Sequence, residues 1–147
     1  MANSLLDTPA GLAKETLAPL KAADEALIIT NPEMPAVTDA LKTLKLCQEL
    51  NKKILGVVIT KTNAKNADLP LKDIEALLET DIIGVIPEDR AVKYSHAKKN
   101  AVVHTHPKSA AAIQYKKLAA ELIGQKYHED IKEDSVLDLV MRFFNIK

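Results

Sequence analysis

Short apolar runs alternate with longer amphipathic segments along this chain of 147 residues. Four of the runs are rich in β-branched residues and lack polar alternation, which is typical of strands that are covered on both faces. We predict strands at residues 27–30, 54–60, 82–86 and 101–104. Because helical segments follow the strands, the pattern indicates a parallel sheet with crossover helices, an α/β fold.

The segments between the strands carry apolar residues three and four positions apart. We predict helices at residues 11–23, 35–50, 71–79, 89–99 and 109–124. The clearest is 35–50, where Val37, Leu41 and Leu44 lie along one face. Cys47 falls on the same face, so we expect it to be a small buried hydrophobe. Gly124 stands where a C-terminal helix cap belongs.

Composition indicates an ordinary globular protein. Apolar residues make up 47% of the chain, and 20 basic side chains balance 20 acidic ones, so we expect no nucleic-acid partner. The single cysteine excludes an internal disulfide and fits a reducing cytosol. We find neither a signal-peptide pattern nor a run of ~18 apolar residues, and therefore expect a cytoplasmic location. We predict one domain over 1–127, a polar linker at 128–134 and an amphipathic helix at 135–147.

The predicted C-terminal helix has a wide apolar face that must be buried somewhere. Its candidate membrane-contacting residues are Leu137, Val140, Met141, Phe143 and Phe144. Only Arg142 and Lys147 are basic over residues 136–147, so attraction to anionic lipid is weak and apolar burial has to drive membrane docking. Packing of the helix against the protein's own sheet or against a partner is the alternative.

The N-terminal stretch raises the question of a phosphate site. Asp7 suits a magnesium-bound water if a strand end holds it, whereas a simpler interpretation makes Asp7 and Thr8 the cap of a helix that begins at Pro9. The four glycines stand at 11, 56, 84 and 124, so no G-x-x-x-x-G-K-[ST] loop can be written in this sequence.

Four short stretches occur in a specific order along the chain: D-T-P-A-G-L at 7–12, T-N-P-E at 30–33, L-G-V-V-I-T at 55–60 and I-G-V-I-P-E-D at 83–89. With them, residues 5–124 resemble the C-terminal half of the ParA/MinD family of P-loop ATPases with a deviant Walker A motif, its archaeal MinD branch in particular. The resemblance implies a partial three-layer, doubly wound, mostly parallel sheet without the N-terminal strands and the P-loop. It also implies ATP and Mg²⁺ at the strand ends and two subunits that enclose two nucleotides.

The resemblance implies a function in cell-division site placement or intracellular positioning, with peripheral membrane attachment through the C-terminal helix. Because the phosphate loop is absent from the sequence, we expect this chain alone not to hydrolyse ATP. The alternative is a non-catalytic module that pairs with a complete MinD-like subunit or another protein.

Individual residues follow from the same resemblance. Asp7 corresponds to the Walker B region, on the magnesium and attacking-water side, and Pro9 and Gly11 belong to its nucleotide-site segment. Thr60 stands where relatives commonly have the Asn that contacts adenine. Its single hydroxyl provides fewer hydrogen-bonding groups for a base than the donor and acceptor of an amide.

The proline-acid stretch at Pro87, Glu88 and Asp89 matches the adenine side of the family. Taken without the resemblance, it is a strand-to-helix turn with Asp89 as the N-cap.

Asn31, Glu33 and Asp39 lead into the helix that lies near the dimer and partner surface in the family. A carboxylate in the first turns of a helix also complements the helix dipole with no further task. His104 and His106 would share one face of the predicted strand at 101–104, but no third metal ligand has a convincing spacing, so we expect surface histidines.

Overall fold

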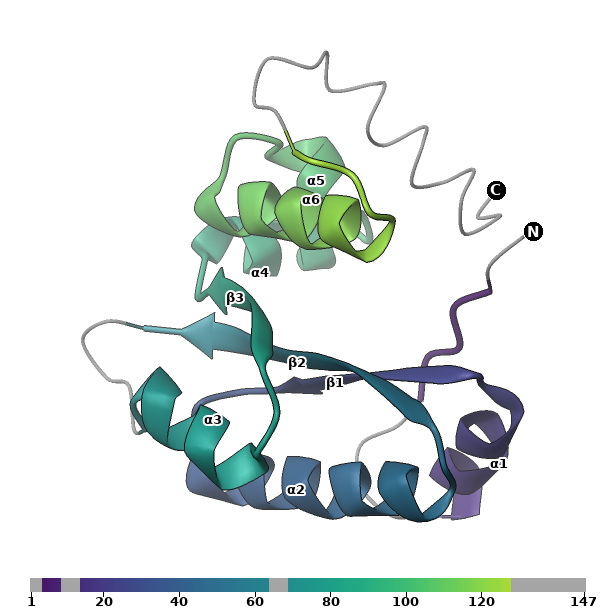
Figure 1. Ribbon diagram of the computed structural model, residues 1–147. Helices are drawn as coiled ribbons and strands as arrows, with labels where there is room; N and C mark the ends of the chain where they lie inside the picture. The colour runs from purple at the N-terminus through teal and green to yellow at the C-terminus, as the bar shows by residue number, and fades with distance from the viewer. Residues whose placement is uncertain (1–3, 9–13, 64–68, 128–147) are drawn as a thin grey trace. The chain divides into compact units, whose positions relative to one another are not determined.

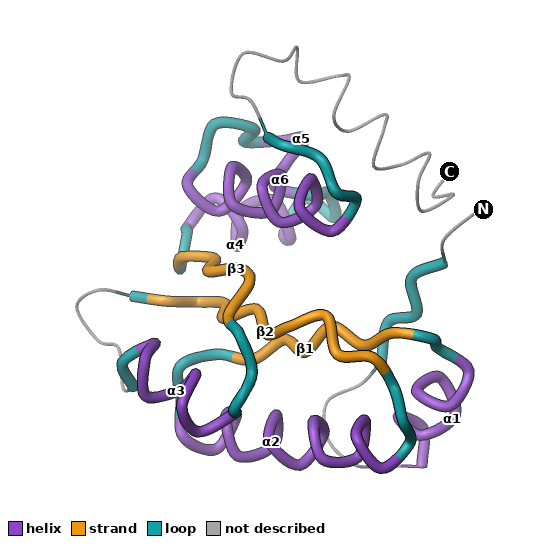
Figure 2. Tube along the Cα trace, in the orientation of Figure 1, coloured by secondary structure: helices purple, strands orange, loops and turns teal. Residues whose placement is uncertain are grey.

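The computed structural model describes residues 4–8, 14–63 and 69–127 (Figures 1 and 2). The chain divides into a sheet unit, Leu6–Pro87, and a helical unit, Glu88–Lys147 with Met1–Leu5. The elements, in chain order, are α1 (Lys14–Ala22), β1 (Glu25–Thr30), α2 (Met34–Glu49), β2 (Lys53–Thr62), α3 (Leu71–Leu78), β3 (Ile82–Pro87), α4 (Arg90–Ala97), α5 (Val102–Thr105) and α6 (Ala110–Leu122). Three of the four predicted strands are therefore confirmed, as are the predicted helices over their described residues.

The sheet unit contains three parallel strands in the order β1-β2-β3. Figure 1 shows α2 and α3 running along the same side of this sheet. Because the strands are parallel, their carboxyl ends lie on the same side of the sheet. There Thr30 of β1 is paired with Ile59 of β2, and Thr62 of β2 with Pro87 of β3. The predicted α/β class with a parallel sheet is confirmed.

The core of the sheet unit lies between the strands and α2 and α3. Every third or fourth residue of α2 is buried in it, and Ala26 and Ile28 of β1 and Val57 and Ile59 of β2 face the same cluster. Cys47 is completely buried there, as predicted, and burial raises the pKa of its thiol. The period of the apolar positions in α2 thus decides which face of the helix meets the sheet.

Gly56 of β2 occupies an irregular point in the pairing with β1. Ala26 pairs with Ile54 but Leu27 pairs with Gly56, so β2 carries one extra residue there. Gly56 has φ +143°, and a Cβ on it would meet Cγ2 of Ile83 at 2.6 Å. A glycine is required at this bulge for both reasons.

The helical unit differs from the prediction at residues 101–104, which are not a strand. Val102–Thr105 form the single helical turn α5, closed by hydrogen bonds from the N–H groups of His104 and Thr105 to the carbonyl of Ala101. The two valines favour a strand only locally, and a short apolar run does not distinguish strand from helix by itself. Contacts with α4 decide the outcome, as described below.

The last described helix, α6, has both predicted ends. Ser109 caps its start by accepting a hydrogen bond from the N–H of Ala112, and Gly124 has φ +70° just beyond its end. The N–H groups of Gly124 and Gln125 return to the carbonyls of Glu121 and Ala120. Within the described residues, no helix is both long and apolar enough to cross a membrane.

Candidate functional site

The carboxyl ends of the three strands are linked by threonine hydroxyls. Thr60 Oγ1 donates to the carbonyl oxygen of Thr30 at 3.1 Å, and Thr62 Oγ1 donates to that of Ile86 at 3.4 Å. Both hydroxyls therefore tie β2 to a neighbouring strand. Because a hydroxyl has one proton, Thr60 Oγ1 is left with lone pairs and acts toward any further group as an acceptor.

The connection from β1 to α2 is a tight polar turn. The N–H of Glu33 donates to Oδ1 of Asn31 at 3.4 Å, and Glu33 then stands at the N-cap of α2 without a side-chain capping bond. Its carboxylate is thus left exposed at the positive end of a helix, beside the partly exposed Asn31.

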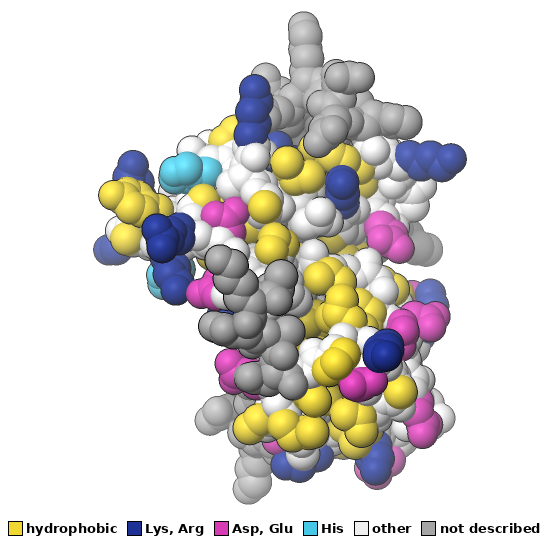
Figure 3. All heavy atoms as spheres, turned by 90° about the vertical axis from the view of Figure 1, so that its left-hand side faces the viewer, with side chains coloured by type: hydrophobic (Ala, Val, Ile, Leu, Met, Phe, Trp, Pro, Cys, Tyr) yellow, Lys and Arg dark blue, Asp and Glu magenta, His cyan; other side chains and the backbone are white. Residues whose placement is uncertain are grey.

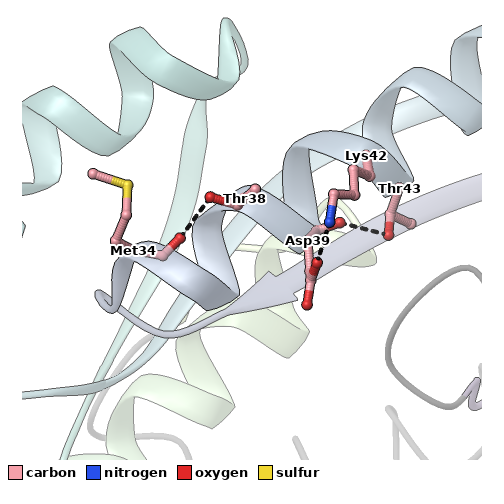
Figure 4. A network of polar contacts seen from close by, with 5 residues as sticks. All are labelled: Met34, Thr38, Asp39, Lys42 and Thr43. Atoms are coloured by element: carbon pink, nitrogen blue, oxygen red, sulfur yellow. Dashed lines mark hydrogen bonds and ion pairs between the residues drawn. The ribbon is translucent and has the colours of Figure 1, made fainter.

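The first turns of α2 present a polar surface (Figure 4). Asp39 pairs with Lys42 at 2.9 Å, with both side chains more than half exposed, and accepts at its carbonyl from Thr43 Oγ1 at 2.9 Å. Thr38 Oγ1 donates to the carbonyl of Met34 at 2.8 Å, and the Met34 side chain projects away from the helix and is 52% exposed. The structure therefore brings the predicted partner-surface residues Asn31, Glu33 and Asp39 to one end of α2.

Figure 3 looks at the molecule from the side where β1 and β2 end, and hydrophobic side chains gather on that surface among the elements of the sheet unit. Met34 at the start of α2 and Leu71 at the start of α3 are exposed apolar residues of this unit. This end of the sheet unit thus combines hydroxyls, carboxylates and apolar side chains.

Asp89, two residues after the end of β3, caps two helices at once. Its Oδ1 accepts the N–H of Ala91 in α4 at 2.8 Å, and its Oδ2 accepts the N–H of Ala111 in α6 at 3.1 Å. The N–H of Ala111, followed by that of Ala91, lowers the pKa of Asp89, and Ser109 and His106 act in the same direction. The geometry thus shows Asp89 as the N-cap of α4, as the simpler interpretation predicts. It also shows a second cap, on α6, that the sequence did not indicate.

A cluster of polar side chains, formed by buried Ser95 and partly buried Thr105 and His106, joins α4 to α5. Ser95 Oγ donates to the carbonyl of Ala91 at 2.6 Å, contacts Thr105 Oγ1, and lies 3.3 Å from Nδ1 of His106. His106 Nδ1 is also 3.0 Å from Thr105 Oγ1. These bonds satisfy the buried hydroxyl of Ser95 and link α4 to Thr105 at the end of α5.

The remaining predicted site residues lie near the two ends of the sequence. Residues 4–8, which include Asp7, are exposed and have no regular secondary structure, so Asp7 does not stand at the end of a strand in this structure. A strand needs a neighbour for its backbone groups, and Leu5 and Leu6 have instead 65% and 50% of their surface exposed. Pro9, Gly11 and the candidate membrane-contacting residues within 135–147 lie outside the described residues.

Comparison with known proteins identifies the family. A profile described as "ParA: NUBPL iron-transfer P-loop NTPase" matches residues 4–123. The chain belongs to the ParA/MinD family of P-loop NTPases.

Two curated relatives of this ParA/MinD chain illustrate the range. The uncharacterized ATP-binding protein MJ0547 of Methanocaldococcus jannaschii is 36% identical over 88% of this chain and 49% of its own length. The septum site-determining protein MinD of Neisseria meningitidis serogroup B is 32% identical over 82% of this chain and 48% of its own length. The chain thus spans about half the length of these relatives.

Solved structures agree on the ParA/MinD fold. The cell division ATPase MinD of Pyrococcus furiosus has a TM-score of 0.75 at 31% identity and covers 80% of this chain and 50% of its own. MinD of Pyrococcus horikoshii OT3, solved in complex with Mg-ADP, has a TM-score of 0.74 at 28% identity, with coverage of 79% and 48%.

Two features of this ParA/MinD chain escaped sequence reasoning. The second cap made by Asp89 depends on the position of Ala111 in α6, 22 residues further on, and sequence spacing does not show that. Ser95 carried a signal that was not used, because a polar residue on the buried side of a helix requires a hydrogen-bonding partner. His104 and His106 are on and just after a helical turn, and no group of three or more His, Cys, Asp or Glu side chains that could hold a metal occurs among the described residues.

Proposed function

We propose that this chain carries the base-side strand ends of a ParA/MinD-type ATP site and acts together with a phosphate-binding loop from outside its own 147 residues. One observation carries the proposal: three parallel strands end side by side, bridged by hydroxyls, in a chain of a P-loop family whose own sequence holds no P-loop. Open α/β sheets bind ligands outside the carboxyl ends of their strands. ATP with Mg²⁺ is the ligand that the family supports.

Thr60 makes the proposal more specific. Its proton is used by the carbonyl of Thr30, so Oγ1 offers only acceptor lone pairs. An exocyclic amine such as that of adenine fits this acceptor, whereas the carbonyl oxygen that guanine has in the same place does not. Pro87 and Glu88 follow the neighbouring strand end, and with Asp89 used twice as a cap, backbone groups of Pro87–Glu88 are the better candidates for base contact.

Hydrolysis by this chain alone is expected to be negligible. Phosphoryl transfer relies on backbone amides and a lysine that hold the β- and γ-phosphates, and the sequence lacks the loop that provides them. Asp7 is proposed to serve Mg²⁺ and the attacking water only once that loop is present.

Nucleotide titration of the isotope-labelled chain tests the base side. We expect Mg-ATP at millimolar concentration to shift the backbone amide signals of Thr60 and Thr62, and Mg-GTP to shift them much less. Thr60→Val should abolish this preference, while Thr38→Val, which removes an exposed hydroxyl bonded within α2, should leave it unchanged. Equal responses to the two nucleotides would contradict the role of Thr60.

A turnover assay tests the catalytic half of the proposal. ATP hydrolysis should match the protein-free blank, for the wild type and for Asp7→Ala. Turnover that survives purification and disappears in Asp7→Ala would overturn the claim that this chain alone is inactive.

We further propose that the chain functions in cell-division site placement or intracellular positioning, in a dimer or paired with a complete MinD-like subunit. The supporting observation is the exposed start of α2, where Glu33, Met34 and Asp39 are available to a partner. A MinD of Aquifex aeolicus solved in complex with MinC has a TM-score of 0.74 at 26% identity. Loss of co-purification with a full-length relative on Asp39→Lys, with Lys72→Glu on α3 as the control, would support this surface.

Peripheral membrane attachment through 135–147 is a separate proposal, which rests on the apolar face of that segment. Sedimentation with anionic vesicles, lost on changing Phe143 and Phe144 to serine, tests it. A chain that never sediments with vesicles would contradict it.

A further inference from the structure

The charges of the chain are unevenly distributed along it. Basic and acidic side chains balance at 20 each, yet residues 90–117 contain seven Lys and Arg and no Asp or Glu. This segment runs from the start of α4 into α6 and belongs to the helical unit. The zero net charge of the whole chain therefore conceals a strongly basic segment in one unit.

The basic face of α4 consists of Arg90, Lys93, Lys98 and Lys99. Arg90 and Lys93 are exposed one turn apart in the helix, and Lys98 and Lys99 are exposed directly after its end. Nζ of Lys98 lies 6.0 Å from the ring centroid of Tyr94, which is itself 66% exposed. Figure 3 shows Lys and Arg side chains gathered on one side of the helical unit.

Ion pairs neutralise little of the basic face. Lys93 pairs with Glu88 at 3.1 Å, and both side chains are exposed. Within the part of the chain that the structure describes, no ion pair involves Arg90, Lys98 or Lys99. Like charges on one short helix repel one another, so an anionic segment that reaches all of them is stabilising.

The complementary charge follows in the same chain, within the polar linker predicted at 128–134. The acidic stretch, residues 129–134, has four acidic side chains and one lysine. It begins two residues after Tyr127, the last described residue of the helical unit. We propose that the acidic stretch docks on the basic face of α4 and shields this face from other anions.

Reach and tethering both favour this occupant. Six extended residues span about 20 Å, whereas the eight residues of α4 measure about 12 Å. Attachment to the same chain gives the acidic stretch an effective concentration in the millimolar range, so ion pairs that are weak singly act together. A second copy of the chain offers the same stretch only at its concentration in solution.

Carbodiimide cross-linking of the full chain tests the docking. The reagent joins a lysine amine to a carboxylate that is in contact with it, and peptide mass spectrometry identifies the pair. At about 0.01 M ionic strength we expect cross-links from Lys98 and Lys99 to the acidic stretch. At about 1 M their yield should be at least roughly fivefold lower, because the Debye length falls from about 30 Å to about 3 Å. Lys72, exposed on α3 of the sheet unit, is the internal control and should not be linked to the stretch.

A charge exchange separates docking from the mere presence of reactive groups. Replacement of Glu133 and Asp134 by lysine should reduce the cross-links from Lys98 and Lys99 to the rest of the stretch at least roughly fivefold, because two attractive charges become repulsive. Adding Lys98→Glu and Lys99→Glu should restore contact, now as cross-links between positions 98–99 and 133–134. Lys98 and Lys99 are exposed, so the fold should be retained, and circular dichroism verifies this.

Three results would overturn the docking: equal yields at the two ionic strengths, a yield from Lys72 that equals the yield from Lys98, or a folded charge-exchange variant that does not restore contact. A mixture of isotope-labelled and unlabelled chains identifies the source of each link. Links that join labelled to unlabelled peptides would assign the basic face to a second copy, and would overturn the proposal too. None of these measurements involves a nucleotide or a membrane, so the docking and the proposed function fail separately.

Discussion

Replacement of Asp89 by alanine removes two helix caps with one substitution. The carboxylate accepts the N–H of Ala91 at 2.8 Å and that of Ala111 at 3.1 Å, at the starts of α4 and α6. Loss of an N-cap carboxylate costs about 1 kcal/mol. The second bond adds about 1 kcal/mol, because Asp89 is partly exposed and water can replace it in part.

Asp89→Ala should therefore destabilise the protein by about 2 kcal/mol, which corresponds to a fall in Tm of roughly 4–8 °C for a chain of this size. Asp89→Asn keeps one acceptor oxygen, so it can still cap α4 but loses the bond to Ala111. We expect it to cost about half as much. Asp39→Ala is the control, since its pairing with Lys42 is exposed and should contribute well under 1 kcal/mol.

The tyrosines make the assay specific. The chain has no tryptophan, and its three tyrosines, Tyr94, Tyr115 and Tyr127, all belong to the helical unit. Tyrosine fluorescence during thermal unfolding thus reports on the unit that Asp89 holds together. If the Tm of Asp89→Ala lies within about 1 °C of the Tm of Asp39→Ala under the same conditions, the double cap has no energetic importance and the reasoning fails.

The pH dependence gives an independent check on the same carboxylate. Its pKa is lowered in the folded protein, so its contribution is fully present above the ordinary value of 3.8 and is lost as the pH falls through the lower folded value. The difference in stability between the wild type and Asp89→Asn should therefore be constant near neutral pH and shrink in acid below 3.8. A difference that grows toward low pH would have the wrong sign.

Two further predictions concern the sheet unit. Gly56→Ala should lower the free energy of unfolding in urea by about 1–3 kcal/mol, because the new Cβ meets Ile83 at 2.6 Å and the backbone has φ +143°. Gly124→Ala, with open space around it, is the control and should cost only about 1 kcal/mol. Equal costs for the two variants would contradict the packing at the bulge. Cys47 should react with a thiol reagent at least about a hundredfold more slowly in the native than in the unfolded chain, because burial restricts access to the thiol and raises its pKa. In the control variant Thr38→Cys, the exposed thiol at position 38 should react rapidly. Fast labelling of Cys47 would show that α2 opens readily.

The sequence was most informative where one physical effect dominated. The strands at 27–30, 54–60 and 82–86 follow from runs of apolar and β-branched residues, and the buried face of α2 follows from the spacing of its apolar residues; these positions are confirmed. The expectation that every strand is covered on both faces is wrong for β1, because Ile29 has 58% of its surface exposed. The turn at 102–105 was mistaken for a strand, because Val102 and Val103 favour extended backbone while the deciding contact, Ser95 with Thr105, comes from another helix. Local patterns do not show such contacts.

The candidate site was predictable to the same extent. Strand ends follow from strand positions: Thr60 lies two residues before the end of β2, and Pro87 is the last residue of β3. The hydroxyl bond from Thr60 to Thr30 requires the register between the two strands, which depends on the bulge at Gly56. The second cap of Asp89 requires the position of α6 and was therefore not accessible.

The double role of Asp89 alters how a short sequence signature should be interpreted. A proline-acid-aspartate stretch after an apolar strand scores as a nucleotide-binding motif, yet in this chain the aspartate has a sufficient reason to be present without any nucleotide. A relative that had lost ATP binding would keep this aspartate for as long as it kept the two helices that Asp89 caps. Identity at this position therefore records inheritance of the architecture, because the caps on α4 and α6 are enough to account for the aspartate.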